Sequence, residues 1–354
     1  VIYPYFRTLH DLNISAISDN HFQISFDREK GVPTYRFWGW NIPRLRLEPL
    51  LWKMQVKRLF KSYVGEYGMP DLIHAHNILW GGFSAMAIGE QTGLPFVVTE
   101  HTSSFARGLI QPWQERFIKQ VISKSDCLLT VSSKLADQMQ THTKDKKIEV
   151  VPNVVDTDYF TPPSKQRDAH LFRILTVALL TPVKRIDVLL KAFAQAFDPN
   201  DNVLLEIGGD GIHRKELEKL TAKLHLENRV RFLGLLSREQ VLEAMRRSNI
   251  SVLPSYVETF GVVLIEAMAT GLPVVATRCG GPEDIVAPET GWLIEPGNVE
   301  ELAAVLKNAY LDYHEIKKKE SYIRDYAVNH FSGEKIASTL LKHYNNVLNK
   351  WLYI

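Results

Sequence analysis

Short runs of apolar, often β-branched residues alternate along the chain with segments of helical periodicity. Uninterrupted apolar runs are typical of parallel strands buried on both faces, because half-exposed strands alternate apolar with polar residues. We expect such strands at 72–75, 96–99, 127–131, 174–178, 203–207, 230–233, 250–253 and 274–277. Between two of them, Asp187 to Phe197 repeats apolar residues every three or four positions, which predicts an amphipathic crossover helix.

Two polar pairs indicate where further helices begin. Ser237 precedes Gln240 by three positions, and Asn298 precedes Glu301 by the same interval. This is the spacing of a capping box, in which the two side chains accept backbone N–H groups of the first helical turn. The alternation of strands and helices along the whole chain predicts an α/β fold with parallel sheets.

The chain is too long for a single hydrophobic core. Cores rarely grow past about 250 residues, so 354 residues predict two doubly wound parallel-sheet domains. A polar stretch with several prolines and no periodicity follows Val151 and predicts the connection between the domains. The expected division is an N-terminal domain at 1–155, a linker at 156–170, a C-terminal domain at 171–326 and a C-terminal helix at 327–354 that crosses back to the N-terminal domain.

The composition of the chain disfavours several classes of binding partner and of location. The 42 Lys and Arg residues balance 40 Asp and Glu residues to a net charge of +2, so no overall field favours nucleic acid as a partner. Cys127 and Cys279 stand far apart without a CxxC motif, which disfavours a disulfide framework or structural zinc and fits a reducing cytoplasm. No apolar run approaches the ~18 residues of a membrane span. We expect a cytoplasmic protein with, at most, peripheral membrane contact.

The most informative segment follows the predicted strand 250–253. Gly261 stands where the next helix should open, and a glycine there lets a diphosphate approach the unpaired backbone N–H groups of the first turn. Glu258 precedes this helix and Glu266 lies in its second turn, so both carboxylates are candidates to accept hydrogen bonds from sugar and ribose hydroxyls. Spacing alone equally allows a helix-stabilising Glu258 and a solvated Glu266.

These residues carry a resemblance to a known family. Two glutamates separated by seven residues, enclosing Phe260-Gly261 and followed by Ala267-Met268-Ala269, resemble the signature of glycosyltransferase family 4. The resemblance continues through the segments 151–153, 208–211, 271–277 and 280–283. Members are retaining enzymes of the GT-B fold, in which two Rossmann-like domains face each other across a cleft.

The resemblance implies roles for the residues of this signature. It implies that Glu258 contacts hydroxyls of the donor sugar and that Glu266 contacts the ribose. It also implies that Phe260, Gly261 and Val262 border the donor. Two glycines downstream are either a simple turn or a loop whose missing side chains admit the donor, and the resemblance favours the loop; they are Gly280 and Gly281.

Positive charge for the leaving diphosphate is expected after the strand 174–178. Lys184 stands at the entrance to the following helix, where an ammonium group can neutralise a departing diphosphate; a solvated lysine is the alternative. Family members usually place an arginine five residues earlier, but this chain has Leu179 there. Arg185 occupies a position that is often glycine in the family, and we expect its guanidinium to supply the absent charge.

The remaining candidates follow other strands. Gly208 and Asp210, in a glycine-rich segment that does not match GxGxxG, are expected to border the nucleotide. His76 and His101 each follow a strand in the N-terminal half, although a lone histidine is more often structural than catalytic. The sequence Glu100-His101-Thr102 resembles the segment with the family's active-site histidine, so His101 is the first choice for catalysis, and His76 and Thr102 are further cleft candidates.

Together these residues predict a glycosyltransferase that moves a hexose-type sugar from a nucleoside diphosphate to a hydroxyl acceptor, with retention of configuration. Its partners would be a nucleotide-sugar donor and a glycan or lipid-linked acceptor of polysaccharide or glycolipid biosynthesis. Neither a metal ion nor a cofactor is expected, because fixed protein charges take over the role of a divalent ion. Two alternatives stay open: a nucleotide-sugar epimerase of the same fold, and a non-catalytic nucleotide-sugar-binding protein.

Two further expectations concern the N-terminal half. The opening Val1-Ile2-Tyr3-Pro4 matches the family's second strand, so a strand, a loop and a helix of ~35–40 residues are expected to be missing before it. The basic run from Arg44 to Lys61 contains a cationic stripe beside an apolar one. That pattern suits either an anionic membrane surface or an ordinary amphipathic helix. The cationic stripe is Lys53, Lys57 and Lys61, and its apolar neighbour is Trp52, Val56, Leu59, Phe60 and Tyr63.

Overall fold

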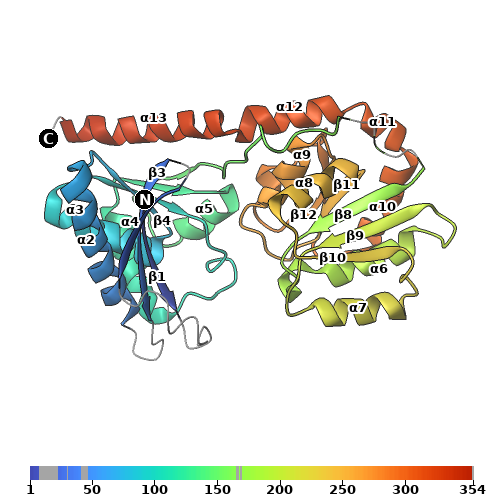
Figure 1. The fold of residues 1–354 in the computed structure, drawn as a ribbon, viewed down its shortest axis with the longest axis horizontal. Helices are drawn as coiled ribbons and strands as arrows, with labels where there is room; N and C mark the ends of the chain where they lie inside the picture. The colour runs from blue at the N-terminus through green and yellow to red at the C-terminus, as the bar shows by residue number, and fades with distance from the viewer. Residues whose placement is uncertain (8–22, 30, 41–46, 165–166, 168–169, 353–354) are drawn as a thin grey trace.

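In a computed structural model, the chain forms two α/β halves joined by a linker and by a long C-terminal helical segment (Figure 1). The structure describes residues 1–7, 23–29, 31–40, 47–164, 167 and 170–352, without the side chains of Phe6 and Arg7. Arg44, Arg46 and part of the predicted linker lie outside these residues. No helix in the described ranges is long and apolar enough to span a membrane.

The C-terminal half is built on one parallel sheet of six strands, in the order β10-β9-β8-β11-β12-β13. The strands are β8 (Phe172–Val177), β9 (Val203–Gly208), β10 (Val230–Gly234), β11 (Ile250–Leu253), β12 (Val274–Thr277) and β13 (Gly291–Ile294). The helices are α6 (Ile186–Ala196), α7 (Arg214–Lys223), α8 (Arg238–Arg247), α9 (Val262–Ala269), α10 (Val299–Leu311) and α11 (Tyr313–Lys317), with short helices η5 (Pro182–Lys184) and η6 (Pro282–Asp284). Five predicted strands are confirmed here to within two residues, and β13 was not predicted.

The strand order has its switch point between β8 and β11. From β8 the chain continues outward to β9 and β10, and then returns to the other side of β8 with β11. In open α/β sheets, ligands bind outside the carboxyl ends of the strands where the order reverses in this way. The segments that follow β8 and β11 therefore define the place where a ligand is expected.

The N-terminal half differs from the single sheet that was expected. One sheet has the order β4-β5-β6-β7 and is parallel, and its strands are β4 (Ile73–His76), β5 (Phe96–Glu100), β6 (Cys127–Thr130) and β7 (Ile148–Val150). A separate sheet has the order β1-β3-β2 and contains an antiparallel pair; its strands are β1 (Ile2–Arg7), β2 (Ile24–Glu29) and β3 (Val32–Trp40). Within the described residues, β1 and β4 are thus edge strands of different sheets.

Helices cover the N-terminal sheets and tie the two halves together. The helices of this half are α2 (Glu48–Tyr67), α3 (Phe83–Thr92), α4 (Glu115–Lys124) and α5 (Ser133–Gln140), with short helices η3 (Ile78–Gly82) and η4 (Pro112–Gln114). At the end of the chain, α12 (Glu320–Phe331) lies against α9, and α13 (Gly333–Leu352) runs back along the N-terminal half (Figure 1). There Ile336 and Val347 share a buried cluster with Val97 and Leu129.

The chain crosses between the halves twice, at neighbouring positions. The Val155 N–H donates to the Phe331 carbonyl over 3.0 Å, so the start of the linker lies beside the junction of α12 and α13. Arg324 of α12 donates to the Phe160 carbonyl of the linker over 3.0 Å. These contacts fasten the linker to the returning helix.

Candidate active site

Two charged side chains meet at the switch point of the C-terminal sheet. Lys184 ends the short helix η5 that follows β8, and Glu258 lies in the loop after β11. The Lys184 ammonium forms an ion pair with the Glu258 carboxylate, and the two side chains are 23% and 16% exposed. Two predicted site residues that are 74 positions apart are therefore in direct contact.

The backbone around Glu258 is clamped to the loop that contains the two predicted glycines. The Gly281 N–H donates to the Glu258 carbonyl over 2.8 Å, and the Glu258 N–H donates to the Cys279 carbonyl over 3.3 Å. A Cβ atom on Gly280 would lie 2.7 Å from the Glu258 oxygen, and one on Gly281 would lie 2.2 Å from the Phe260 Cα. The space left by the missing side chains is thus filled by the backbone of the Glu258 loop.

Helix α9 opens beside this loop with an N-terminal turn that no side chain caps. Gly261 has a φ of 104° in the left-handed region, which glycine adopts without strain. The N–H groups of the first turn, beginning at Val262, are suited to an anion. The Phe260 side chain is only 2% exposed and packs edge-on against Phe331 at 6.1 Å, so only its backbone faces this loop.

Glu266 lies further along α9 and is half-buried. Burial raises the pKa of its carboxyl above the usual value, and the nearby charge of Arg238 opposes that shift. Its carboxylate has no hydrogen-bond partner among the described residues, so it can accept hydrogen bonds from a ligand. Its acceptor chemistry agrees with the predicted ribose contact, which the structure leaves as a prediction.

The guanidinium of Arg185, which was expected to replace the charge of the family's usual arginine, already has a carboxylate partner. It donates to both carboxylate oxygens of Asp187, over 3.1 and 3.3 Å, at the start of α6. Arg185 has a positive φ of 49°, which turns the chain between η5 and α6. Leu179, at the position where relatives have arginine, is 61% exposed. Lys184 is therefore the cation that contacts Glu258, while Arg185 is held by its own helix.

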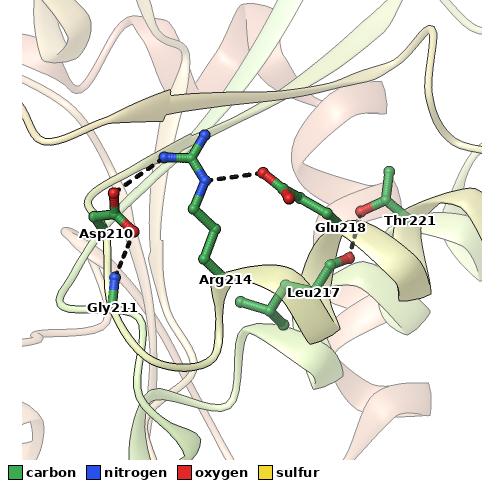
Figure 2. A network of polar contacts seen from close by, with 6 residues as sticks. All are labelled: Asp210, Gly211, Arg214, Leu217, Glu218 and Thr221. Carbon is green, nitrogen blue, oxygen red and sulfur yellow. Dashed lines mark hydrogen bonds and ion pairs between the residues drawn. The ribbon is translucent and has the colours of Figure 1, made fainter.

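Gly208 and Asp210 lie at and after the carboxyl end of β9, next to β8. A Cβ on Gly208 would lie 2.7 Å from a Leu236 methyl group, so an alanine here would require the Leu236 side chain to shift. Figure 2 shows the Arg214 guanidinium between the carboxylates of Asp210 and Glu218, at 3.2 and 2.8 Å. Asp210 also accepts the Gly211 N–H over 2.7 Å, so its side chain orders the loop after β9.

In the N-terminal half, the structure joins the two histidine candidates. His76 ends β4 and His101 follows β5, and His76 Nδ1 lies 2.8 Å from His101 Nε2. Burial lowers the pKa of both imidazoles below the usual value, so both are neutral near pH 7. Thr102 lies beside them, and its N–H donates to the Glu100 carboxylate over 2.7 Å.

Sequence reasoning missed the residues that hold these histidines. Glu100 is buried, and its carboxylate accepts the N–H groups of Ile78, His101 and Thr102. Asn153 lies in the loop after β7, and its Oδ1 accepts a hydrogen bond from His101 Nδ1 over 3.1 Å. The proline-asparagine pair after the seventh strand was visible in the sequence, but nothing local indicated its partner.

Two arrangements were expected for α2 from the sequence, a membrane-facing helix and an ordinary amphipathic helix with its apolar face on the core. The apolar neighbours of its cationic stripe face inward: Leu59 is fully buried, and Tyr63 packs on a cluster with Tyr35 and Phe37. The ordinary amphipathic arrangement therefore applies to that face.

A different apolar pair on α2, Leu50 and Met54, is exposed. A cavity of ≈ 500 Å³ lies between α2 and the end of α3, and its lining includes Lys57, Arg58, Phe60, Lys61, Val64 and Ile88.

Comparisons with known proteins agree with this architecture. A family model described as "Glycosyl transferases group 1" matches residues 161–330, and one described as "Glycosyltransferase Family 4" matches residues 16–159. Structurally, the chain is similar to HepE of Anabaena, solved in complex with UDP and glucose, with a TM-score of 0.74 and 22% identity over 89% of this chain and 87% of that chain. This likeness concerns the fold, which is GT-B.

Two curated relatives show how far the sequence similarity extends. The chain is 32% identical to a D-inositol 3-phosphate glycosyltransferase of Mycolicibacterium smegmatis, over 65% of this chain and 57% of the relative. It is 30% identical to the N-acetyl-alpha-D-glucosaminyl L-malate synthase of Bacillus anthracis, over 78% of this chain and 75% of the relative. The chain thus spans somewhat over half the length of the first of these and three quarters of the second. With both halves matched, the chain belongs to glycosyltransferase family 4.

Proposed function

We propose that this chain transfers a sugar from a nucleoside-diphosphate donor to a hydroxyl group of an acceptor, with retention of configuration at the anomeric carbon. The observation that carries the proposal is the contact of Lys184 with Glu258 at the switch point of the C-terminal sheet, next to the uncapped start of α9. The chemistry is complementary to a sugar diphosphate. An ammonium group and free N–H groups suit the phosphates, and a carboxylate suits sugar hydroxyls.

The proposed reaction breaks the bond between the anomeric carbon and the diphosphate oxygen. The nucleoside diphosphate leaves with the bonding electrons, and the N–H groups at Val262 together with Lys184 stabilise its growing charge. The acceptor oxygen attacks the same face of the sugar, and its proton passes to the departing phosphate oxygen. No carboxylate nucleophile takes part in this scheme.

Glu258 and Lys184 have linked tasks in this scheme. Each neutralises the other in a half-buried setting, where an unpaired charge would be costly. A diphosphate competes with the carboxylate for the ammonium group, and the sugar hydroxyls then donate to Glu258. Glu266, whose carboxylate has no hydrogen-bond partner among the described residues, is proposed to accept hydrogen bonds from the ribose.

Two further elements of the proposal concern the substrates. The complex of HepE with UDP and glucose supports a nucleoside-diphosphate hexose as donor, without deciding the base for this chain. The names of the two curated relatives support a phosphorylated or carboxylated small molecule as acceptor, and the glycan or lipid-linked acceptor expected from the sequence stays a prediction. Exposed Leu50 and Met54 beside the cationic lining of the α2 cavity support a peripheral contact with an anionic membrane.

A non-catalytic nucleotide-sugar-binding protein is the second candidate. Exposed Leu179, in the place of a usual arginine, and the pairing of Arg185 with Asp187 favour it, because both leave the diphosphate with one less cation. The epimerase alternative has no observation of its own in its favour.

A product assay separates the candidates. The purified chain is incubated with a panel of nucleoside-diphosphate hexoses and hydroxyl acceptors, and products are identified by mass spectrometry and by the anomeric proton coupling. We expect a glycosylated acceptor with the donor's anomeric configuration. Isomerised donor without transfer would indicate an epimerase, and a thermal shift by the donor without any product would indicate a binding protein.

A further inference from the structure

Four half-buried aromatic side chains gather at the carboxyl ends of β4 and β5. Two of them follow β4, in η3 and α3, and two follow β5, in η4 and α4; they are Trp80, Phe83, Trp113 and Phe117. The two indoles lie nearly parallel, with ring centroids 5.8 Å apart and an angle of 21° between their planes. The Phe117 ring meets those of Trp80 and Phe83 edge-on, at 5.7 and 4.9 Å. We call these four residues the aromatic cluster.

Most of the aromatic cluster lies outside the hydrophobic core. Phe83 packs against the main buried group of apolar residues. Trp80, Trp113 and Phe117 are not among the residues packed on any buried apolar group of the described chain. Large neighbouring rings that the core does not bury are typical of a surface that binds a ligand.

The backbone that carries Trp80 is strained. Trp80 has a φ of 62°, in the left-handed region that bulky side chains rarely adopt, and Asn77 at the start of the same loop has a φ of 66°. The loop is folded tightly on the end of β4, since a Cβ on Gly81 would lie 2.3 Å from the His76 carbonyl oxygen. Strain of this kind is concentrated at functional sites, where a side chain must be held in one place.

The edge of the sheet that carries the aromatic cluster meets the C-terminal half. Ser133 follows β6, which is the neighbour of β5, and its N–H donates to the Asp284 carboxylate of η6 over 2.5 Å. A Cβ on Gly280 would lie 3.7 Å from the Lys134 side chain and 2.7 Å from the Glu258 carbonyl oxygen. The aromatic cluster therefore shares its edge of the sheet with a contact to the proposed donor site.

Two cations border the aromatic cluster. The Arg116 guanidinium lies 4.6 Å from the centre of the Phe117 ring, and the Lys53 ammonium lies 5.8 Å from the centre of the Phe83 ring. Neither cation has a carboxylate partner within the part of the chain that the structure describes. The acidic neighbour of Arg116, Glu115, lies 3.3 Å from His142 instead. Both cations can therefore pair with an anionic group of a ligand.

We propose that the aromatic cluster is a binding surface for the acceptor, and that the acceptor is an acidic sugar, a ring that carries a phosphate or carboxylate group. The C–H face of a sugar ring carries partial positive charge and packs on the negative face of an aromatic ring. The anionic group is complementary to Arg116 and Lys53. The proposal rests on the proposed function and adds the chemical class of the acceptor to it.

A panel of acceptors tests the chemical class. Transfer is measured to glucose, mannose and galactose, to their 6-phosphates and uronic acids, and to glycerol 3-phosphate, which has charge without a ring. We expect kcat/KM to be at least ~10-fold higher for an acidic ring than for its neutral counterpart and for glycerol 3-phosphate. Equal values, or transfer only to other acceptors, would overturn the proposal while leaving the donor site in place. A chain that transfers no sugar to any acceptor contradicts the proposed function instead.

Removing each cation tests where the anionic group binds. We expect Arg116→Gln and Lys53→Gln each to lower kcat/KM ~10-fold for the acidic ring and to leave it within ~2-fold for the neutral ring. Lys119→Gln removes an exposed cation from the same helix as Arg116 and should change neither value. Equal losses for both rings would mean that the cations act only through the structure, and would refute their contact with the acceptor.

Replacing each indole tests the surface itself. Trp80→Leu and Trp113→Leu keep an apolar side chain but remove the aromatic face. We expect each to raise KM for the acidic ring at least ~5-fold and to leave KM for the donor within ~2-fold. Trp351→Leu, on α13, removes an exposed indole elsewhere and is the control. Should either leucine variant have a lowered unfolding midpoint, phenylalanine at the same position keeps a ring and should restore the acceptor KM. An unchanged acceptor KM in both folded leucine variants would overturn the proposal.

Discussion

The two halves place side chains of different charge at the ends of their strands. In the C-terminal half, the residues proposed to face the ligand are a charged pair, Lys184 and Glu258, on a continuous sheet of six strands. In the N-terminal half, they are imidazoles that burial keeps neutral, on a sheet of four strands. A diphosphate needs fixed charge, while a hydroxyl needs only a neutral hydrogen-bonding group.

The halves also differ in how their loops are held. The C-terminal loops are joined backbone to backbone, as where Gly281 donates to the Glu258 carbonyl. The N-terminal loops are joined through side chains, chiefly the buried Glu100 carboxylate and the amide of Asn153. Backbone contacts fix a site without depending on protonation, whereas contacts through ionisable side chains respond to pH. This difference leads to distinct expectations for substitutions and for pH.

The largest expected effect is the loss of the charged pair. We expect Glu258→Ala and Lys184→Ala each to reduce sugar transfer at least ~100-fold, because one preorganised contact with the transition state is worth ~3 kcal/mol. Initial rates with saturating donor and acceptor measure the effect. Lys191→Ala and Glu300→Ala remove the same side-chain types elsewhere in the C-terminal half and should leave the rate within ~3-fold. Near-normal rates in a folded Glu258→Ala variant would falsify the assignment of the pair.

Adding a methyl group tests the backbone clamp. In Gly281→Ala, the new Cβ would lie 2.2 Å from the Phe260 Cα, so the loop must shift. We expect a loss of about 3 kcal/mol in the free energy of unfolding, together with weaker donor binding. Gly65→Ala on α2 is the counterpart, because its Cβ meets no atom within 4 Å and alanine favours a helix by ~0.5–1 kcal/mol. Urea unfolding of both variants decides the comparison, and equal stabilities would contradict it.

The pH dependence of stability should come largely from the N-terminal half. Burial, with the neighbouring imidazoles, lowers the pKa of His74 from 6.5 to about 4. A group with a depressed folded-state pKa binds more protons when unfolded, so stability is full above pH 6.5 and falls as the pH drops toward 4. By this linkage, moving from pH 7.5 to pH 5 costs about 2 kcal/mol.

Urea unfolding at the two pH values measures this loss. His74→Gln keeps a polar side chain beside Tyr344 but cannot be protonated, so it should flatten the dependence. His314→Gln, on an exposed histidine, should leave the dependence as it is. If the free energy of unfolding of His74→Gln falls between the two pH values as much as that of the unaltered chain, other groups cause the acid sensitivity.

Prediction from the sequence worked best where burial is complete. Strands such as β11 and β12 are buried at every position, so their apolar runs mark them directly, and the predicted bounds are those observed. The strands that were missed, such as β2 and β7, are short or half-exposed. They contain too few apolar residues in a row to predict a strand. Ser237 forms the predicted capping box, whereas Asn298 caps α10 and the Glu301 carboxylate takes the Glu295 N–H in place of the expected backbone partner.

For the site, the sequence indicated residue types and strand ends, but not contacts. Lys184 and Glu258 were both candidates, yet their ion pair depends on the strand order that sets β8 beside β11. Arg185 was expected to supply the charge that is absent at Leu179, but Asp187 two positions later holds its guanidinium. The hydrogen bond between His76 and His101 joins separate strands, so no local pattern could predict it.

A smaller effect is expected for the membrane contact proposed for α2. A basic side chain near an anionic surface contributes ~1 kcal/mol, so Lys57→Gln, Arg58→Gln and Lys61→Gln should each lower binding to phosphatidylserine vesicles ~5-fold. Raising the salt concentration should weaken binding of the unaltered chain. Co-sedimentation measures both, with Lys342→Gln on α13 as the control. Binding that is independent of these cations would leave α2 a structural helix.

The smallest expected effect is that of a metal chelator. It concerns the C-terminal half, where charged side chains lie at the ends of the strands. A diphosphate leaving group must be neutralised either by a bound divalent ion or by fixed positive groups of the protein. Here the Lys184 ammonium and the N–H groups at the start of α9 lie at the same switch point, and we propose that they supply that charge. We therefore expect EDTA to leave the initial rate within ~2-fold of its untreated value. A rate that collapses with EDTA and returns with magnesium or manganese would mean that the protein's own charges are insufficient, and the Leu179 position, which carries no cation, would then be the first place to seek the deficit.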